Sequence, residues 1–135
     1  MLFRSKVGIF YTDIDRVSYY LEGNKKSGNG VFEHKLHLSL LYNSKQQRSY
    51  SEVSFCDKWN KCENKGHELK TISSIATNCK KDTCDFTEVM DVAISHDFLN
   101  DALNKGFSMR LISKKKTNKI VISKGYLMGY LQMVK

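Results

Sequence analysis

The 135-residue chain has no proline, and no stretch rich in glycine, serine or proline divides it. No run approaches the roughly 18 apolar residues of a membrane-spanning helix, which excludes a segment of that kind. The first residues lack the apolar region and small-residue cleavage site of a signal peptide. We therefore expect one domain over residues 1–135 and, if the protein is exported, a mature chain that has lost its signal.

Acidic residues are absent from residues 102–135. This quarter holds eight of the 22 Lys/Arg and none of the 14 Asp/Glu, so the rest of the chain is neutral and the whole net charge of +8 lies here. Such an excess is compatible with docking on phosphate, nucleic acid or anionic lipid, or with a solvated surface. We predict that a partner is contacted by Arg110, Lys114, Lys115, Lys116, Lys119 and Lys124.

Alternating apolar and polar residues predict strands in the first two thirds of the chain. The clearest is 31–42, where Leu36, Leu38 and Leu40 share one face. A glycine-rich loop is expected over 23–30 and a polar loop over 57–66. Further strands are expected at 7–12, 17–21, 50–55, 69–76 and 87–94, the last two forming a hairpin.

The last third changes to helical spacing. Ser95 can cap a helix that ends before Gly106, and Ser123 can cap a second one whose buried stripe includes Tyr126 and Tyr130. Between them, the apolar runs 107–112 and 119–122 are joined by a charged turn. Strands first and helices late predict an α+β fold with a curved antiparallel β-sheet or β-sandwich-like core, in which two short C-terminal helices flank a β-hairpin.

The four cysteines form two close pairs, Cys56 with Cys62 and Cys79 with Cys84. Zinc-binding pairs are usually two to four residues apart, so the second spacing is tolerable and the first is loose. A tight turn can bring two cysteines within disulfide distance. Two disulfides are favoured, with a structural zinc site or buried free thiols as alternatives. Local pairing would stabilise by about 2 kcal/mol a bond and crossed pairing by about 3.5, which does not decide the connectivity.

Histidines and carboxylates offer general bases and partners without a recognisable catalytic context. His34 and His37 are three residues apart on an expected strand, so they should point to opposite faces and share neither metal nor substrate. We therefore predict no enzyme, no cofactor and no metal site. The candidates considered are His34, His37, His67 and His96, with Glu33, Glu88 and Asp91.

Residues 69–134 resemble the C-terminal half of small exported proteins and lipoproteins of Gram-negative bacteria that have no assigned activity. The matching residues are Cys79, Cys84, Phe86, Thr87, Glu88, Tyr126, Gly129, Tyr130 and Leu131. The chain departs from that pattern by having Ser123 and Lys124 where a proline often stands, and by its extra cysteine pair. The resemblance implies a periplasmic or cell-envelope location and no known chemistry.

Local disulfide pairing is the preferred connectivity, because each pair brackets its own polar turn and the resemblance involves the second pair alone. Together these features predict a non-catalytic envelope protein that binds a protein partner or a surface through its basic C-terminal hairpin. The alternatives are a small basic protein that binds nucleic acid or phosphate, and a structural zinc-binding domain.

Overall fold

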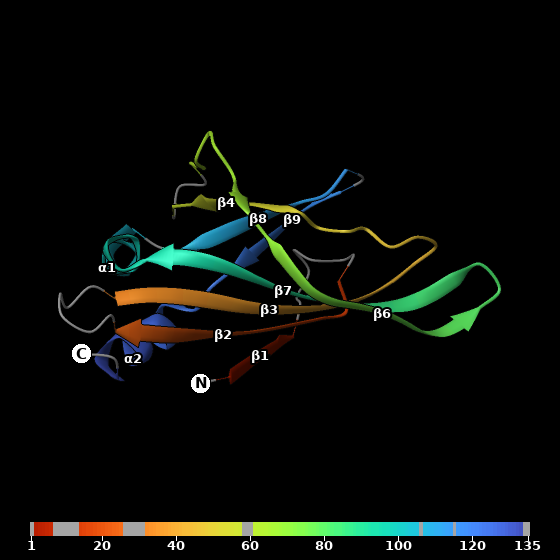
Figure 1. The fold of residues 1–135 in the computed structure, drawn as a ribbon, viewed down its shortest axis with the longest axis horizontal. Helices are drawn as coiled ribbons and strands as arrows, with labels where there is room; N and C mark the ends of the chain where they lie inside the picture. The colour runs from red at the N-terminus through yellow and green to blue at the C-terminus, as the bar shows by residue number, and fades with distance from the viewer. Residues whose placement is uncertain are drawn as a thin grey trace.

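The structure, a computed structural model, describes residues 2–6, 14–25, 32–57, 61–105, 107–114 and 116–133. Within these ranges the chain forms strands and two helices (Figure 1). In chain order they are β1 (Leu2–Lys6), β2 (Arg16–Lys25), β3 (Phe32–Ser44), β4 (Glu52–Cys56), β5 (His67–Glu68), β6 (Lys70–Lys80), β7 (Thr83–Ser95), α1 (His96–Lys105), β8 (Ser108–Ile112), β9 (Thr117–Val121) and α2 (Lys124–Met133).

The strands form two antiparallel sheets, one in the order β1-β2-β3-β7-β6 and one in the order β5-β4-β8-β9. Figure 1 shows β4, β8 and β9 lying over the long strands β3 and β7, while the turn of the β6–β7 hairpin projects beyond the rest. The helices come late in the chain and flank the β8–β9 hairpin. The expected α+β fold with a mainly antiparallel sheet is therefore confirmed.

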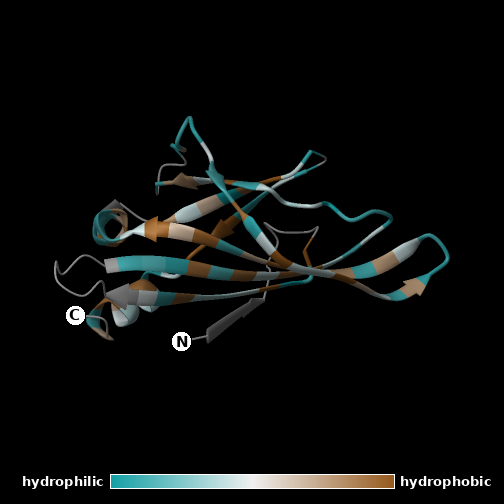
Figure 2. Ribbon diagram, in the orientation of Figure 1, coloured by the Kyte–Doolittle hydropathy of each residue, from teal (hydrophilic) through white to brown (hydrophobic). Residues whose placement is uncertain are grey.

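The core lies between the sheets because both present one apolar face. Along β3 the side chains of Leu36, Leu38 and Leu40 are buried, as the alternation predicted, and Figure 2 shows apolar and polar residues alternating on this strand. The second sheet adds side chains such as Val53 and Met109, which are fully buried. One hydrophobic cluster includes residues of both sheets and both helices.

Both predicted helix caps are confirmed. Ser95 Oγ accepts a hydrogen bond from the Phe98 N–H at 3.2 Å, and Ser123 Oγ accepts one from the Tyr126 N–H at 3.2 Å. Helix α2 docks on β2, because the Tyr126 hydroxyl accepts a hydrogen bond from the Leu21 N–H at 2.8 Å. The expected stripe of α2 is buried, namely Tyr126, Leu127, Tyr130 and Leu131.

Some expected boundaries differ from the structure. Strand β2 continues to Lys25 although residues 23–30 were expected to be a loop, because Gly23 pairs with His34 and extends the β2–β3 hairpin. Strand β4 begins at Glu52, two residues later than expected. The strand expected at 7–12 and the helix-ending Gly106 lie outside the described residues.

The four cysteines form two local disulfides, Cys56–Cys62 and Cys79–Cys84. Local pairing is thus confirmed, and the zinc and free-thiol alternatives are wrong, because each sulfur is bonded to another sulfur rather than available as a thiolate ligand. Two disulfides are compatible with an extracellular or periplasmic protein. Neither helix of the described chain has the length and apolar character needed to cross a bilayer.

Candidate functional site

The predicted cations are presented by the β8–β9 hairpin and the start of α2. Arg110 lies opposite Lys119 in the register of the two strands, and both side chains are exposed on the face turned away from the core. The next residue along each strand, Met109 on β8 and Ile120 on β9, is buried on the other face. The alternation of side chains along the hairpin therefore places these two cations on one face and the buried apolar residues on the other.

The hairpin turn has its own hydrogen bonds. The Ser113 N–H donates to the Lys116 carbonyl at 2.9 Å, and the Lys116 N–H donates to Ser113 Oγ at 2.9 Å. Lys114 and Lys116 are exposed on this turn, while Lys115 lies outside the described residues. These bonds fix the backbone that carries the lysines at the tip.

A cavity of about 350 Å³, here called the α2 cavity, lies at the opposite end of the hairpin. Its walls include the apolar side chains of Phe107, Val121 and Leu127. Its polar lining includes Ser108, Ser123, Lys119 and Lys124. Of the six predicted cations, the structure thus brings Lys119 and Lys124 to one cavity, places Arg110 beside Lys119, and leaves the tip lysines at the far end of the hairpin.

A second cavity, of about 340 Å³, lies beside the Cys56–Cys62 disulfide and shares Asp57 and Ala102 with the α2 cavity. Asp57 N–H donates to the Lys61 carbonyl at 3.0 Å, and Glu63 N–H donates to the Phe55 carbonyl at 3.0 Å. The disulfide therefore lies in the lining of the second cavity, and Asp57 beside it lines both cavities.

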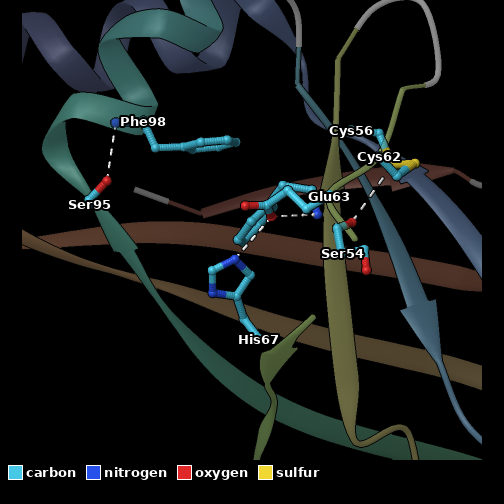
Figure 3. Close-up of polar contacts among 8 residues, drawn as sticks. Ser54, Cys56, Cys62, Glu63, His67, Ser95 and Phe98 are labelled. Carbon is cyan, nitrogen blue, oxygen red and sulfur yellow. Dashed lines mark hydrogen bonds and ion pairs between the residues drawn. A yellow bond between two sulfur atoms is a disulfide. The ribbon is translucent and has the colours of Figure 1, made fainter. Parts of the chain in front are cut away.

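Glu63 is the polar centre of that loop (Figure 3). Its Oε1 accepts a hydrogen bond from the Phe55 N–H at 3.2 Å and lies 2.9 Å from His67 Nε2. The ring of Phe55 packs on that of Phe98 with centroids 4.9 Å apart. His67 thus pairs with a neighbouring carboxylate at the edge of an aromatic cluster.

His37 and Asp91 meet on the outer face of the five-stranded sheet. His37 Nδ1 lies 2.6 Å from Asp91 Oδ1, and the His37 ring stacks on Tyr20 with centroids 4.2 Å apart. The Glu22 carboxylate is 3.8 Å from His37 Nε2. His37 and Asp91 were both candidates from the sequence, but their contact could not be predicted from it. The strand register brings them together, because it places Tyr20, His37 and Asp91 in one row across the sheet.

These three side chains line a cavity of about 290 Å³ that also has Ile72 and Val89 in its wall. The pair can orient an imidazole. Among the described residues, however, no hydroxyl or thiol forms a hydrogen bond to His37 Nε2.

His34 points to the core, opposite to His37, as predicted. Its Nδ1 lies 2.6 Å from the Tyr130 hydroxyl, and its Nε2 lies 2.9 Å from His96 Nδ1. Burial, and to a smaller extent the neighbouring His96, lower the pKa of His34. His34 therefore joins β3 to both helices as a neutral, hydrogen-bonded core residue.

Glu88 faces the core rather than a histidine. Its buried carboxylate accepts hydrogen bonds from the Tyr42 hydroxyl and from the N–H groups of Ser49 at 3.3 Å and Tyr50 at 3.1 Å. It holds the segment that leads from β3 to β4. Glu33, the other carboxylate considered, is exposed. Across the described chain, no group of three or more His, Cys, Asp or Glu side chains is arranged to hold a metal ion.

Sequence reasoning missed the α2 cavity and its buried Ser108. Ser108 is an ordinary residue at the start of a short strand, and only the pairing of β8 with β4 and β9 places it beside Lys119 and the start of α2. A signal in the sequence that could have pointed to this cavity is the pair Ser123-Lys124, because it places a helix cap and a cation at the start of a helix.

Comparisons with known proteins give no independent assignment. A scan against protein-family models, a search of curated proteins and a search of solved structures each found no match to this chain. The likeness to small exported Gram-negative proteins accordingly remains a prediction that rests on the residues named for it.

Proposed function

We propose that this protein is an exported, non-catalytic binding protein of the periplasm or cell envelope, which docks on an acidic surface of a protein partner through its basic β8–β9 hairpin. The observation that carries the proposal is the arrangement of the cations. Arg110 and Lys119 are cross-strand neighbours on one exposed face, and Lys114 and Lys116 extend that charge to the tip.

Electrostatics support a docking role for this face. Arg110 and Lys119 lie directly opposite each other in the antiparallel pair, which places two positive charges close together on this face. No acidic residue follows Asp101 in the sequence, so the hairpin contains no carboxylate of its own to neutralise it. Complementary charge across an interface raises the association rate and selects the partner.

The location rests on two supports. The first is the pair of disulfides, which persist in oxidising compartments such as the periplasm. The second is the resemblance of residues 69–134 to small exported proteins of Gram-negative bacteria. Fractionation of cells that express the protein from its native gene tests the location, and recovery in the cytosol with reduced thiols would contradict this part of the proposal.

The docking surface is tested by charge reversal at the tip. The variant with Lys114, Lys115 and Lys116 all changed to Glu should lose the proteins that the wild type captures from an envelope extract. A matched control changes three exposed lysines on other surfaces, Lys65, Lys70 and Lys80, to Glu. The control should keep the same captured proteins, and an unchanged capture by the hairpin variant would refute the docking surface.

Nucleic acid is the alternative partner of a basic surface. Proteins that bind single strands usually stack bases on exposed aromatic rings. The aromatic residues of the helix that follows the hairpin, Tyr126 and Tyr130, are buried in the core, as predicted. A mobility-shift titration at low salt decides between the two classes, since binding that weakens steeply with salt would favour nucleic acid.

A further inference from the structure

We propose that the Cys79–Cys84 disulfide is a thiol-exchange site, which a dithiol reduces while the Cys56–Cys62 disulfide stays intact. The proposal goes beyond docking by the β8–β9 hairpin and uses none of its residues. The two bonds have sequence separations of 5 and 6, so the length of the closed loop does not distinguish them. They differ in exposure and in what holds the two sulfurs together after reduction.

Access for a thiol differs between the two disulfides. Cys79 is exposed near the end of β6, and the turn that follows it projects beyond the rest of the molecule (Figure 1). Cys84, on β7, is half-buried and packs against the core. At the other bond, Cys56 is 4% exposed and Cys62 is half-buried. Since exchange requires access to a sulfur, a thiol from solvent meets Cys79 first.

The backbone at this end of the β6–β7 hairpin is strained. Asn78 has a φ of 49° and Lys81 a φ of 51°, in the left-handed region that asparagine tolerates and that lysine rarely adopts. The strand register shifts here, so Asn78 and Cys79 together lie opposite Cys84. Such conformations persist only where the surrounding structure imposes them. The disulfide is a constraint of that kind, so breaking it lets the turn relax and the two thiols separate.

The contacts that remain at this hairpin end after reduction are exposed. Asn78 Nδ2 donates to Asp85 Oδ2 at 3.2 Å on the surface, where water competes for the same groups. Beyond that bond, Lys80 pairs with Thr83 around the turn that contains the strained Lys81. These contacts hold the two thiols together weakly. A disulfide whose thiols separate on reduction is the more easily reduced.

The Cys56–Cys62 pair, by contrast, is held in place by the backbone around it (Figure 3). The two cysteines face each other as an antiparallel bridge, and strand β4, to which Cys56 belongs, is paired with β8. Two backbone hydrogen bonds of 3.0 Å flank the bridge, from the Asp57 N–H to the Lys61 carbonyl and from the Glu63 N–H to the Phe55 carbonyl. After reduction these bonds keep the two thiols adjacent. Their effective concentration therefore stays high and the disulfide re-forms.

The exchange proceeds in two steps. A thiolate of the dithiol attacks the exposed Cys79 sulfur, the Cys79–Cys84 bond breaks, and Cys84 leaves as a thiolate that takes up a proton. The second thiolate of the reductant attacks the mixed disulfide and releases Cys79, which takes up the second proton. Both protons come from the thiols of the reductant. The dithiol is thereby oxidised to a disulfide by two electrons, and the protein is reduced by two.

A redox titration of the folded, full-length chain tests the proposal. The protein is equilibrated with dithiothreitol at graded ratios of reduced to oxidised reagent, trapped with N-ethylmaleimide and mapped by mass spectrometry. We expect Cys79 and Cys84 to be half reduced at a ratio about tenfold lower than Cys56 and Cys62, a difference of about 30 mV for two electrons. Equal ratios for the two disulfides, or earlier reduction of Cys56 and Cys62, would overturn the proposal.

Two glycine variants test the strained turn as the cause. Lys81→Gly relieves the positive φ, so the ratio at which Cys79 and Cys84 are half reduced should rise about fivefold. Lys80→Gly removes the same charge one residue earlier, where φ is not positive, and is the matched control without such a rise. An equal rise in both variants, or none in Lys81→Gly, would contradict this cause.

The sulfur that is attacked is identified with a dithiol protein. Thioredoxin with its second active-site cysteine changed to serine cannot complete the exchange and stays attached as a mixed disulfide. Peptide mapping should find it on Cys79, and attachment to Cys84 or to Cys56 would contradict the proposed route. Partner capture by the hairpin tip is measured with both disulfides intact, so failure of either proposal leaves the other standing.

Discussion

At the residue scale, the Tyr42 hydroxyl joins two buried residues, Glu88 and Arg48. It donates to the Glu88 carboxylate and accepts the Arg48 N–H at 2.8 Å. Burial raises the pKa of Tyr42, so the hydroxyl remains a donor at neutral pH. Tyr42→Phe should therefore lower the free energy of unfolding by about 2 to 3 kcal/mol in urea titrations, since two buried polar groups lose a partner.

The matched control for Tyr42→Phe is Tyr20→Phe, which removes a hydroxyl from a half-buried ring on the outer face. A surface substitution of this kind should change the free energy of unfolding by no more than about 0.5 kcal/mol. Equal losses in the two variants would show that the Tyr42–Glu88 contact does not stabilise the core.

His34 makes the stability depend on pH. Its pKa is lowered in the folded protein by burial and by His96, so the unfolded chain binds the proton more readily. Stability from this group is complete above the ordinary histidine pKa of about 6.5 and is lost as the pH falls below it. Urea midpoints should therefore decrease from pH 7.5 to pH 5.5.

The variant His34→Gln tests that assignment, because glutamine retains hydrogen-bonding groups but does not titrate. Its urea midpoint should be lower than that of the wild type at pH 7.5 and should change less between pH 7.5 and pH 5.5. A pH dependence as steep as that of the wild type would assign the effect to other groups.

At the scale of elements, the two disulfides fasten structures of unequal burial. Cys79 stands in β6, an edge strand whose residues are almost all exposed, whereas Cys56 is buried at the end of β4. Each bond closes a loop of similar size and by chain entropy stabilises by about 2 kcal/mol. The two bonds should therefore differ in which part of the molecule loosens when each is removed.

Replacing Cys79 and Cys84 by Ser should increase amide hydrogen exchange in residues 77–84, because an exposed hairpin end can open without disturbing the core. The thermal midpoint of the whole protein should fall less than in the variant with Cys56 and Cys62 changed to Ser. Hydrogen exchange with mass spectrometry and calorimetry measure the two effects, and equal falls in midpoint would contradict this distinction.

Elements with strong local signals could be predicted from the sequence. Both helices begin after their serine caps, and the leucines of β3 alternate as expected. The extent of β2 could not be predicted, because Gly23 is a loop residue by local preference and becomes strand only through pairing with His34. Tertiary pairing overrides local preference at such positions.

At the scale of the whole molecule, one part of the candidate site could be predicted from the sequence and another part could not. The excess of lysine in the last quarter of the chain is visible in the sequence. The α2 cavity is not, because Ser108, Lys119 and Lys124 come from two strands and a helix that only the fold brings together. Composition therefore predicts the sign of the charge on a partner, while the position of a ligand depends on strand register.

The position of the charge, rather than its sum, should govern how the molecule binds anionic surfaces. The triple tip variant, Lys114, Lys115 and Lys116 to Glu, and the control at Lys65, Lys70 and Lys80 both lower the net charge from +8 to +2, because each exchange changes it by two. If a concentrated patch sets the local potential, the tip variant should elute from a cation-exchange column at lower salt than the control, since close charges act together within a Debye length of about 10 Å. Coincident elution would mean that net charge alone determines binding.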